Sequence, residues 1–494
     1  MRKFLLFFLF VLSLVQVSST TFAQIGVTKS GTAVTVPALA ASYTSLSNAL
    51  TALNAITSYT TPGTIIFTCA AGTSETAPST GFVIGSTSLN PLLSATNTVT
   101  IVKASGTVTI NAGVGTATPA SVAPDGIISI RGADYITLDG LTLIDGNAAN
   151  PATMEFGIGL FKSSLSNGAS NNTIRNCTIS VQRINNAAGS GPMVEGSVGI
   201  LMINAIATAA TTALTPTTAA GTNSNNKFYS NTINSGNYGI VFSGFAATTP
   251  FTAGDTGNDI GGTSSATGNT ILNFGGAAAA ANPSAGIRAN NQWSINTQYN
   301  TINNNNGSGV NHPNTLRGIF GQAGTSANAT ISNNTITVKG GGTTFQVTAI
   351  ENAIGATAAS NSVNISNNII TGDYLTATTG AFFGIHHTAT AATVNLTGNT
   401  IYNVSSSGTT VAGMVISSSA TTASQNRIYN IQSTTTGSPV VSGITVTSVG
   451  TSGVTTIQNN LIGDLKAPSS VSVSGADNIT GRTKVVLMPK RRSV

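Results

Sequence analysis

A glycine or alanine followed by an aliphatic residue recurs along most of this 494-residue chain, and each copy begins a short apolar run. Successive copies lie 29 to 47 residues apart, with several intervals close to 30. A common minimum with occasional longer intervals is typical of one structural unit that carries loop insertions of different length. The copies are Gly126-Ile127, Gly157-Ile158, Gly199-Ile200, Gly239-Ile240, Gly286-Ile287, Gly318-Ile319, Ala349-Ile350, Gly384-Ile385, Gly413-Met414 and Gly443-Ile444.

A second signature, an asparagine two residues before an isoleucine, lies in most of the same units. The eight asparagines are Asn231, Asn269, Asn300, Asn334, Asn368, Asn399, Asn426 and Asn460. Two earlier units have Cys177-Thr178-Ile179 and Leu141-Thr142-Leu143 in the same slot. We expect the asparagine to be a turn residue in left-handed backbone space, which Asn tolerates well. We also expect its amide to bond the equivalent amide in the next coil, as in an Asn ladder.

These two signatures predict an all-β fold. A unit of about 30 residues can hold three short strands and three turns, so each strand can pair in parallel with its equivalent one turn later. Gly, Thr, Asn and Val are poor helix formers, which excludes a helical repeat. The prediction is a right-handed parallel β-helix (a solenoid) of about ten to twelve coils, on the order of 60 Å long at one strand spacing per coil.

The chain divides into four predicted parts. Residues 1–23 resemble a secretory signal peptide, because Arg2 and Lys3 precede an apolar run of 14 residues and a small-residue cleavage site at Ala23. Residues 24–63 form an N-terminal segment in which Tyr43 to Ile56 has helical spacing and is expected to cap the solenoid. Residues 64–465 form the β-helix. Residues 466–494 form an irregular basic tail, interpreted either as a short disordered tail or as the end of a truncated gene product.

The chain resembles the pectin-lyase-like right-handed β-helix proteins over roughly residues 43 to 465. The resemblance is carried by a strand at Ile65-Ile66-Phe67, the turn Ala71-Gly72-Thr73-Ser74-Glu75, and the coils with Asn-x-Ile. Its charge-poor, Thr- and Asn-rich version is similar to secreted bacterial surface proteins of the adhesin type. The resemblance implies the fold but not one activity, because this fold hosts lyases, hydrolases and adhesins alike.

The charge distribution argues against nucleic acid as a partner. The formal net charge is +6, but Arg2, Lys3 and the five basic residues from Arg482 to Arg492 lie in the two end segments. The remaining body has twelve basic and thirteen acidic residues, a net charge of −1. Sequence reading also finds no transmembrane segment after signal cleavage.

The highest local density of acidic residues is the only candidate for catalysis. Asp134, Asp139 and Asp145 lie close in sequence to Arg131 and to Asp125. If the chain were an enzyme, the resemblance implies clustered carboxylates with a basic residue close by, and one carboxyl of a pair must donate a proton while the other stays ionised. Asp is also common in turns, and we favour that interpretation.

Other candidate sites are weaker. His386 and His387 are strand neighbours, so their side chains should point to opposite faces, and His312 lies about two coils away. Cys69 and Cys177 are expected to be buried, unpaired thiols. Gly254 to Gly262 has a faint likeness to a calcium-binding Gly/Asp repeat but occurs once. A stripe of tyrosines on one face could bind sugar rings, namely Tyr229, Tyr238, Tyr299, Tyr402 and Tyr429.

The sequence therefore predicts a secreted or cell-surface structural or adhesive module that presents a polar surface to glycans, cell surfaces or matrix. It predicts no cofactor and no metal. The alternative is a polysaccharide lyase or glycoside hydrolase acting on an acidic polysaccharide. An enzyme should place at least two carboxylates and a basic residue together, and the insertions between Gly157 and Gly286 are the expected place for a binding surface.

Overall fold

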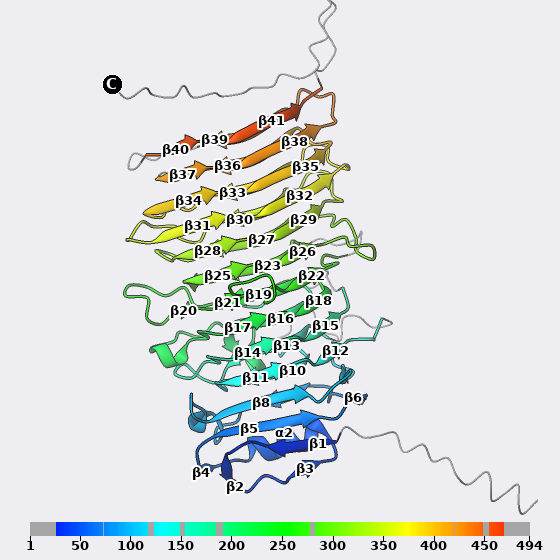
Figure 1. Cartoon of the computed structure of the whole chain (residues 1–494), viewed down its shortest axis with the longest axis vertical. Coiled ribbons are helices and arrows are strands. Elements are labelled where there is room, and N and C mark those ends of the chain that lie inside the picture. The colour runs from blue at the N-terminus through cyan, green and yellow to red at the C-terminus, as the bar shows by residue number, and fades with distance from the viewer. Residues whose placement is uncertain are drawn as a thin grey trace, which may run out of the picture.

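The computed structural model is a rod of stacked coils (Figure 1). It describes residues 26–72, 74–116, 123–148, 154–183, 191–276, 282–418, 420–447 and 454–468. The predicted signal peptide, residues 1–23, and the tail beyond residue 468 lie outside the described residues. Within the described ranges, three long sheets run along the rod and the chain visits them in a fixed order. This arrangement is the predicted right-handed parallel β-helix.

Sheet 1 has 14 strands among the described residues. In spatial order they are β3 (Ser42–Tyr43), β1 (Val27–Ser30), β5 (Thr64–Cys69), β8 (Thr98–Lys103), β11 (Ile136–Asp139), β14 (Thr173–Arg175), β17 (Lys227–Tyr229), β21 (Asp259–Ile260), β25 (Ile295–Gln298), β28 (Ala329–Ser332), β31 (Ser362–Ser366), β34 (Thr393–Thr397), β37 (Thr421–Ser424) and β40 (Thr456–Gln458).

Sheet 2 has 12 described strands, all parallel, so the described chain makes about twelve coils. They are β6 (Ser74–Thr76), β9 (Thr109–Asn111), β12 (Thr142–Ile144), β15 (Thr178–Val181), β18 (Thr232–Ser235), β22 (Thr270–Leu272), β26 (Thr301–Asn303), β29 (Thr335–Lys339), β32 (Ile369–Tyr374), β35 (Thr400–Ser406), β38 (Arg427–Ser433) and β41 (Leu461–Lys466).

Sheet 3 has 11 described strands and contains every repeated Gly-Ile pair. Its strands are β7 (Phe82–Ile84), β10 (Gly126–Arg131), β13 (Phe156–Lys162), β16 (Val198–Ile206), β19 (Tyr238–Ser243), β23 (Ser284–Asn290), β27 (Leu316–Ala323), β30 (Val347–Asn352), β33 (Ala381–His387), β36 (Thr410–Ile416) and β39 (Val440–Val446). Two short pairs stand apart, β2 (Val34–Val36) with β4 (Ser58–Thr61), and β20 (Asp255–Thr256) with β24 (Gln292–Trp293).

The two sequence signatures meet in the interior of the solenoid. A Cβ atom added at Gly199 on sheet 3 would lie 2.4 Å from the Cγ2 atom of Ile233 on sheet 2, and 2.8 Å from the carbonyl oxygen of Gly239 in the next coil. Real Cβ atoms rarely approach that closely, so a small residue lies opposite the isoleucine; it is glycine in every copy except Ala349. The equivalent glycines at 157, 239, 286, 318, 384, 413 and 443 make the same close approach.

The asparagines of the second signature form a continuous ladder at the corner between sheets 1 and 2. Each backbone N–H and each Nδ2 donates to Oδ1 of the asparagine in the next coil, as from Asn300 to Asn334 at 2.9 and 3.0 Å. The Nδ2 atom also donates across the corner to a carbonyl oxygen, for example from Asn334 to Thr297 at 2.9 Å. The same links run from Asn231 through Asn269, Asn300, Asn334, Asn368, Asn399 and Asn426 to Asn460.

The expected backbone conformation of the ladder was wrong by one residue. The ladder asparagines do not have positive φ; the residue before most of them does, as at Tyr299 (φ 58), Asn333 (φ 58) and Gln425 (φ 57). The turn is made one position earlier, which leaves the ladder asparagine buried, with its amide aimed along the solenoid axis. Burial and hydrogen bonding therefore explain the asparagine, and left-handed geometry does not.

Helix α2 (Leu46–Asn54) closes the N-terminal end, as predicted from its spacing. Leu46, Ala49, Leu50 and Leu53 are buried. Glu75 of the first coil accepts hydrogen bonds from the backbone N–H groups of Leu46 and Ser47 at 2.8 and 3.2 Å, which satisfies two free donors at the start of the helix. Within the described residues, no helix is both long and apolar enough to cross a membrane.

Candidate functional site

The acidic candidates from the sequence do not form one site, which corrects the cluster suggested by their spacing. Arg131 ends β10 on sheet 3, Asp139 ends β11 on sheet 1, and Asp145 follows β12 on sheet 2. Asp134 precedes β11, so the four side chains are spread around the circumference of one coil. The turns between β10, β11 and β12 place these residues on three different sheets, so their closeness in sequence does not bring their side chains together.

Each of these carboxylates has a local structural partner. Burial raises the pKa of Asp134 to about 6, and its Oδ1 accepts from the backbone N–H of Ser170 at 2.7 Å. Asp139 pairs with Arg175 at 2.8 Å. Burial also raises the pKa of Asp145, whose Oδ1 accepts from the backbone N–H of Asn147. Of these contacts, that of Asp145 lies within a turn, whereas Asp134 and Asp139 bond residues of the next coil.

The predicted stripe of tyrosines was also wrong. Tyr229 ends β17 on sheet 1, Tyr238 begins β19 on sheet 3, and Tyr402 and Tyr429 lie opposite each other on sheet 2. Only this last pair stacks, with ring centroids 5.3 Å apart. The five tyrosines lie at different offsets from the Asn slot. Tyr402 and Tyr429 do share one offset, and these two share a face.

The histidines and cysteines do not form a metal or nucleophile site among the described residues. His312 and His387 are buried, which lowers the pKa of each to about 4. His386, next to His387, points the other way, to the outer face of sheet 3. Cys69 and Cys177 are both free and buried, and burial raises the pKa of each to about 12. In the Gly254 to Gly262 segment, Asp255 pairs with Lys162 and Asp259 accepts from Tyr229, so both carboxylates already have protein partners.

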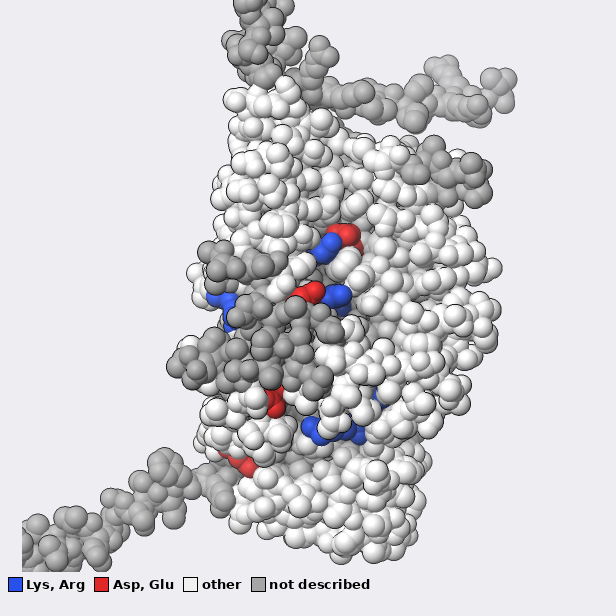
Figure 2. All heavy atoms as spheres, turned by 180° about the vertical axis from the view of Figure 1, so that it is seen from behind, with Lys and Arg blue, Asp and Glu red and all other residues white. Residues whose placement is uncertain are grey.

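A different set of charged residues does converge, on the outer face of sheet 3. We call this set the ion-pair patch; it consists of Glu195, Tyr238, Arg288, Arg317, Glu351 and His386. Figure 2 shows that most of the visible rear face is uncharged, that adjacent blue and red groups lie near its middle, and that other charged groups lie below them. Among the described residues, the patch is therefore a concentration of charge on a chain with only 6% charged residues.

Two arginine–glutamate pairs form the centre of the ion-pair patch. Arg317 donates from Nε and Nη2 to the two carboxylate oxygens of Glu351, at 2.6 and 3.2 Å. Nη1 of Arg288 lies 3.5 Å from Oε2 of Glu195, which also accepts from the Tyr238 hydroxyl at 3.1 Å. The four charged side chains are 17% to 27% exposed, so they are recessed but accessible.

Aromatic and amide groups hold these charged side chains in place. The Arg317 guanidinium lies 4.0 Å from the centroid of the Phe320 ring, and that of Arg288 lies 5.9 Å from the Tyr238 ring. Arg288 also donates to the amide oxygen of Gln322 at 2.8 Å. Burial lowers the pKa of His386, with the neighbouring Glu351 opposing that effect. The patch is an array of donors and acceptors that contact one another, with apolar surface beside it.

The register of sheet 3 explains why these residues meet. Arg288, Phe320, Glu351 and His386 are register partners on four successive strands, from β23 to β33. Each directly follows a Gly-Ile or Ala-Ile pair, the position whose side chain points outward. Arg317 directly precedes such a pair and lies one column away. The residues that flank each Gly-Ile pair include these members of the patch, so the repeat contained the signal for them. The local density of acidic residues along the chain did not.

An apolar cluster on the same outer face forms one border of the patch. Its members are Phe156, Phe161, Met193, Val194, Val198, Leu201, Ile203, Ala205, Ala207, Ala210, Tyr238, Val241 and Ala285, with Phe320 packed against it. Much of the cluster comes from the insertion that follows β15 and from the extended strand β16. Glu195 reaches the patch from this insertion, so the long intervals between Gly157 and Gly286 do contribute to the site.

Comparison with known proteins gives weak similarities. No protein-family model and no curated protein matches the chain. Among solved structures, the A-module of the mannuronan C-5 epimerase AlgE6 of Azotobacter vinelandii is 14% identical, with 84% of this chain and 93% of that chain covered and a TM-score of 0.28. A periplasmic alginate epimerase, AlgG, is 9% identical over 80% and 85% of the two chains, with a TM-score of 0.27. A tailspike protein mutant of E. coli bacteriophage HK620, in complex with pentasaccharide, is 12% identical over 76% and 71%, with a TM-score of 0.20. The fold assignment above rests on the sheet topology of this chain.

Proposed function

We propose that this chain is an exported β-helix module that binds glycans at the ion-pair patch without cleaving them. The observation that carries the proposal is the convergence of Arg288, Arg317, Glu195 and Glu351 on one face of a surface otherwise poor in charge. Planar guanidinium and carboxylate groups can donate to and accept from neighbouring hydroxyls, and an adjacent apolar surface suits the carbon face of a sugar ring. Side chains already held in place lose little freedom on binding.

The engagement of both glutamates supports binding rather than cleavage. Glycoside hydrolysis by a carboxyl pair needs one carboxyl to donate a proton to the leaving group. In the patch, Glu351 accepts two hydrogen bonds from Arg317, and Glu195 accepts one from Tyr238 beside Arg288. Export is part of the same proposal and rests on the signal-peptide pattern of residues 1–23.

The alternative function is an enzyme acting on an acidic polysaccharide. The specific observation in its favour is that the patch combines two glutamates, two arginines, a tyrosine and a histidine, which meets the requirement set out from the sequence. An arginine could neutralise a sugar carboxylate, and Tyr238 or His386 could exchange a proton.

One experiment separates the two functions. The chain from residue 24 onward is tested against neutral and acidic polysaccharides for binding, and the same mixtures are assayed for new reducing or unsaturated ends. We expect binding without release of ends. Arg317→Ala should weaken binding by at least about tenfold, the equivalent of about 1.4 kcal/mol.

Arg175→Ala is the matched control, since Arg175 also pairs with a carboxylate, Asp139, but lies on sheet 1. It should leave binding unchanged. Release of ends that is lost in Glu351→Gln would establish the enzyme instead. A folded protein that binds no member of the panel would contradict the proposal.

A further inference from the structure

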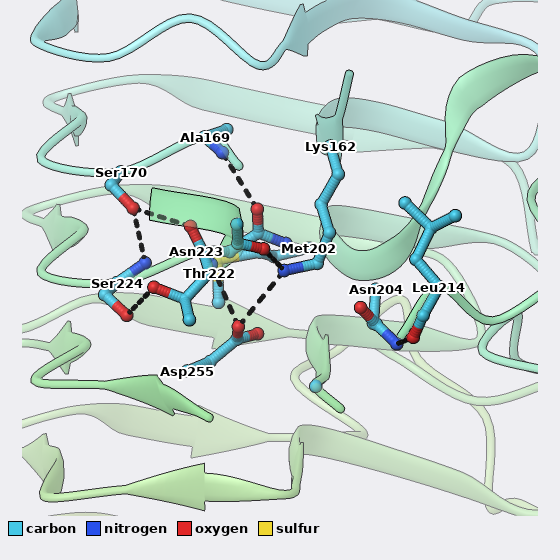
Figure 3. Close-up of polar contacts among 12 residues, drawn as sticks. Lys162, Ala169, Ser170, Met202, Asn204, Leu214, Thr222, Asn223, Ser224 and Asp255 are labelled. Atoms are coloured by element: carbon cyan, nitrogen blue, oxygen red, sulfur yellow. Dashed lines mark hydrogen bonds and ion pairs between the residues drawn. The ribbon is translucent and has the colours of Figure 1, made fainter. Parts of the chain in front are cut away.

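A lysine and an aspartate lie completely buried between the insertion-bearing coils, away from the ion-pair patch. Lys162 ends β13 and Asp255 begins β20, and their side chains are 0% and 1% exposed. Nζ of Lys162 lies 3.5 Å from Oδ1 of Asp255, and Figure 3 shows the two side chains pointing toward each other. Burial lowers the pKa of Lys162, because a charged ammonium is poorly solvated there.

The surroundings hold this pair in a defined geometry. The ammonium group of Lys162 donates to the carbonyl oxygen of Gly221. The backbone N–H of Asn223 donates to Oδ1 of Asp255 at 2.9 Å, while Asn223 itself is fixed by Ala169 and Ile203. In the described part of the chain, Oδ2 of Asp255 is buried and has no hydrogen-bond partner. The two oxygens of this carboxyl group are therefore in different environments.

We propose that Lys162 and Asp255 condense into an intramolecular isopeptide bond after the chain folds. The Nζ proton passes to the carboxylate, which gives an amine beside a carboxylic acid. The amine lone pair attacks Cγ to form the Nζ–Cγ bond. Oδ2 then leaves with two protons as one water molecule, so no oxidant, reductant or further reactant is needed.

Three features of the site favour this step. Both charges are buried, and the neutral amide removes the unfavourable burial of each. The N–H of Asn223 is aimed at Oδ1, the oxygen on which negative charge develops during attack. The unpartnered Oδ2 is the oxygen that has no hydrogen bond to lose when it departs. Because the linked residues are 93 positions apart, the bond would tie the insertion before β20 to the end of β13.

The decisive measurement is a peptide map of the folded, full chain after denaturation. If the bond forms, trypsin will not cut after Lys162, and the peptide 132–175 will be joined to the peptide 228–288 with the loss of one water. Intact mass alone is insufficient, because Asp125-Gly126, Asp139-Gly140 and Asp145-Gly146 can also lose water as succinimides. Succinimides hydrolyse in mild alkali, whereas the cross-link persists.

The variants make the result specific. Lys162→Met and Asp255→Ala should each lack the joined peptide, whereas Asp255→Asn could still form the bond with release of ammonia. Should either substitution prevent folding, the wild-type map still decides the question. Separate, unmodified peptides that contain Lys162 and Asp255 in the folded wild-type protein would overturn the proposal and leave an ion pair.

Discussion

The coils between β25 and β38 and the coils between β13 and β21 use the same repeat in different ways. In the first region, the same asparagine-ladder hydrogen bonds recur in each coil, and neighbouring ladder asparagines are 27 to 34 residues apart. In the second region, longer insertions add an apolar cluster outside sheet 3 and a buried Lys162–Asp255 pair. The comparison teaches that the repeat supplies the fold, while departures from it supply features that occur once in the described chain.

This difference predicts that, in the insertion-bearing coils, the loss of one contact can lower the free energy of unfolding substantially. Lys162→Met removes the proposed bond and also leaves Asp255 as an uncompensated buried charge, so it should lower the free energy of unfolding by about 3–5 kcal/mol. Chemical denaturation monitored by circular dichroism measures the loss. The double variant Lys162→Met with Asp255→Leu removes that charge but cannot form the bond, so it should recover only the part of the loss that the buried charge causes. A double variant as unstable as the single one would show that the charge contributes nothing to the loss.

In the regular coils, the largest losses of stability should instead come from substitutions of the ladder asparagines. Asn334→Ala removes a side chain that links Asn300, Thr297 and Asn368, and leaves buried donors and acceptors without partners. We expect a loss of about 2–4 kcal/mol in unfolding free energy. Asn395→Ala is the control, because the hydrogen bond from its side chain to Asn364 lies on the outer surface of sheet 1. Equal losses in the two variants would contradict a special role for the ladder.

The pH dependence of stability should also originate outside the regular coils. Burial raises the pKa of Glu155 to about 8, with Asp125 beside it raising it further. The folded state therefore holds this proton more tightly than the unfolded state, so the stabilisation is complete below the ordinary pKa of 4.5 and is lost as pH rises through about 8.

Glu155→Gln should flatten the melting temperature across that window. One pKa unit corresponds to about 1.4 kcal/mol, so an effect above that size is expected. Melting curves at several pH values test this, and a wild-type profile that is already flat between pH 4.5 and 8 would contradict it.

The smallest effect is expected at the outer surface of the regular coils. Tyr429 is 37% exposed and stacks on Tyr402, so Tyr429→Ala should cost about 0.5–1.5 kcal/mol. The midpoint of denaturation gives the value. A loss as large as that of Asn334→Ala would mean that outer stacking rivals the ladder in holding the coils together.

The prediction of the fold succeeded where it depended on a contact that recurs in successive coils. Gly199 faces Ile233 and Asn300 bonds Asn334, and each contact recurs at the same offset, so spacing alone revealed it. The capping helix was predicted for a similar reason, because Leu46, Ala49, Leu50 and Leu53 have helical spacing.

The candidate site was largely missed. Asp134, Asp139 and Asp145 are close in sequence, but the coil carries them onto different faces, whereas Arg317 and Glu351 lie 34 residues apart and form a bidentate pair. Density along the chain is a poor guide in a solenoid, since each coil brings together residues about 30 positions apart. Glu195 and the Lys162–Asp255 pair had no repeated signal at all.

The sequence by itself determined the stacking of this protein: its coil length, the glycine–isoleucine interior and the asparagine corner, because these contacts join equivalent positions in neighbouring coils. Only the tertiary structure decided which individual side chains meet on the outer face of sheet 3 and in the buried site at Lys162. At Glu195 and at the buried site, those contacts depend on how insertions of unequal length fold over a regular frame, and insertions have no period from which positions can be read. Arg288, Phe320, Glu351 and His386 instead follow the repeat, and they meet because of the register of sheet 3.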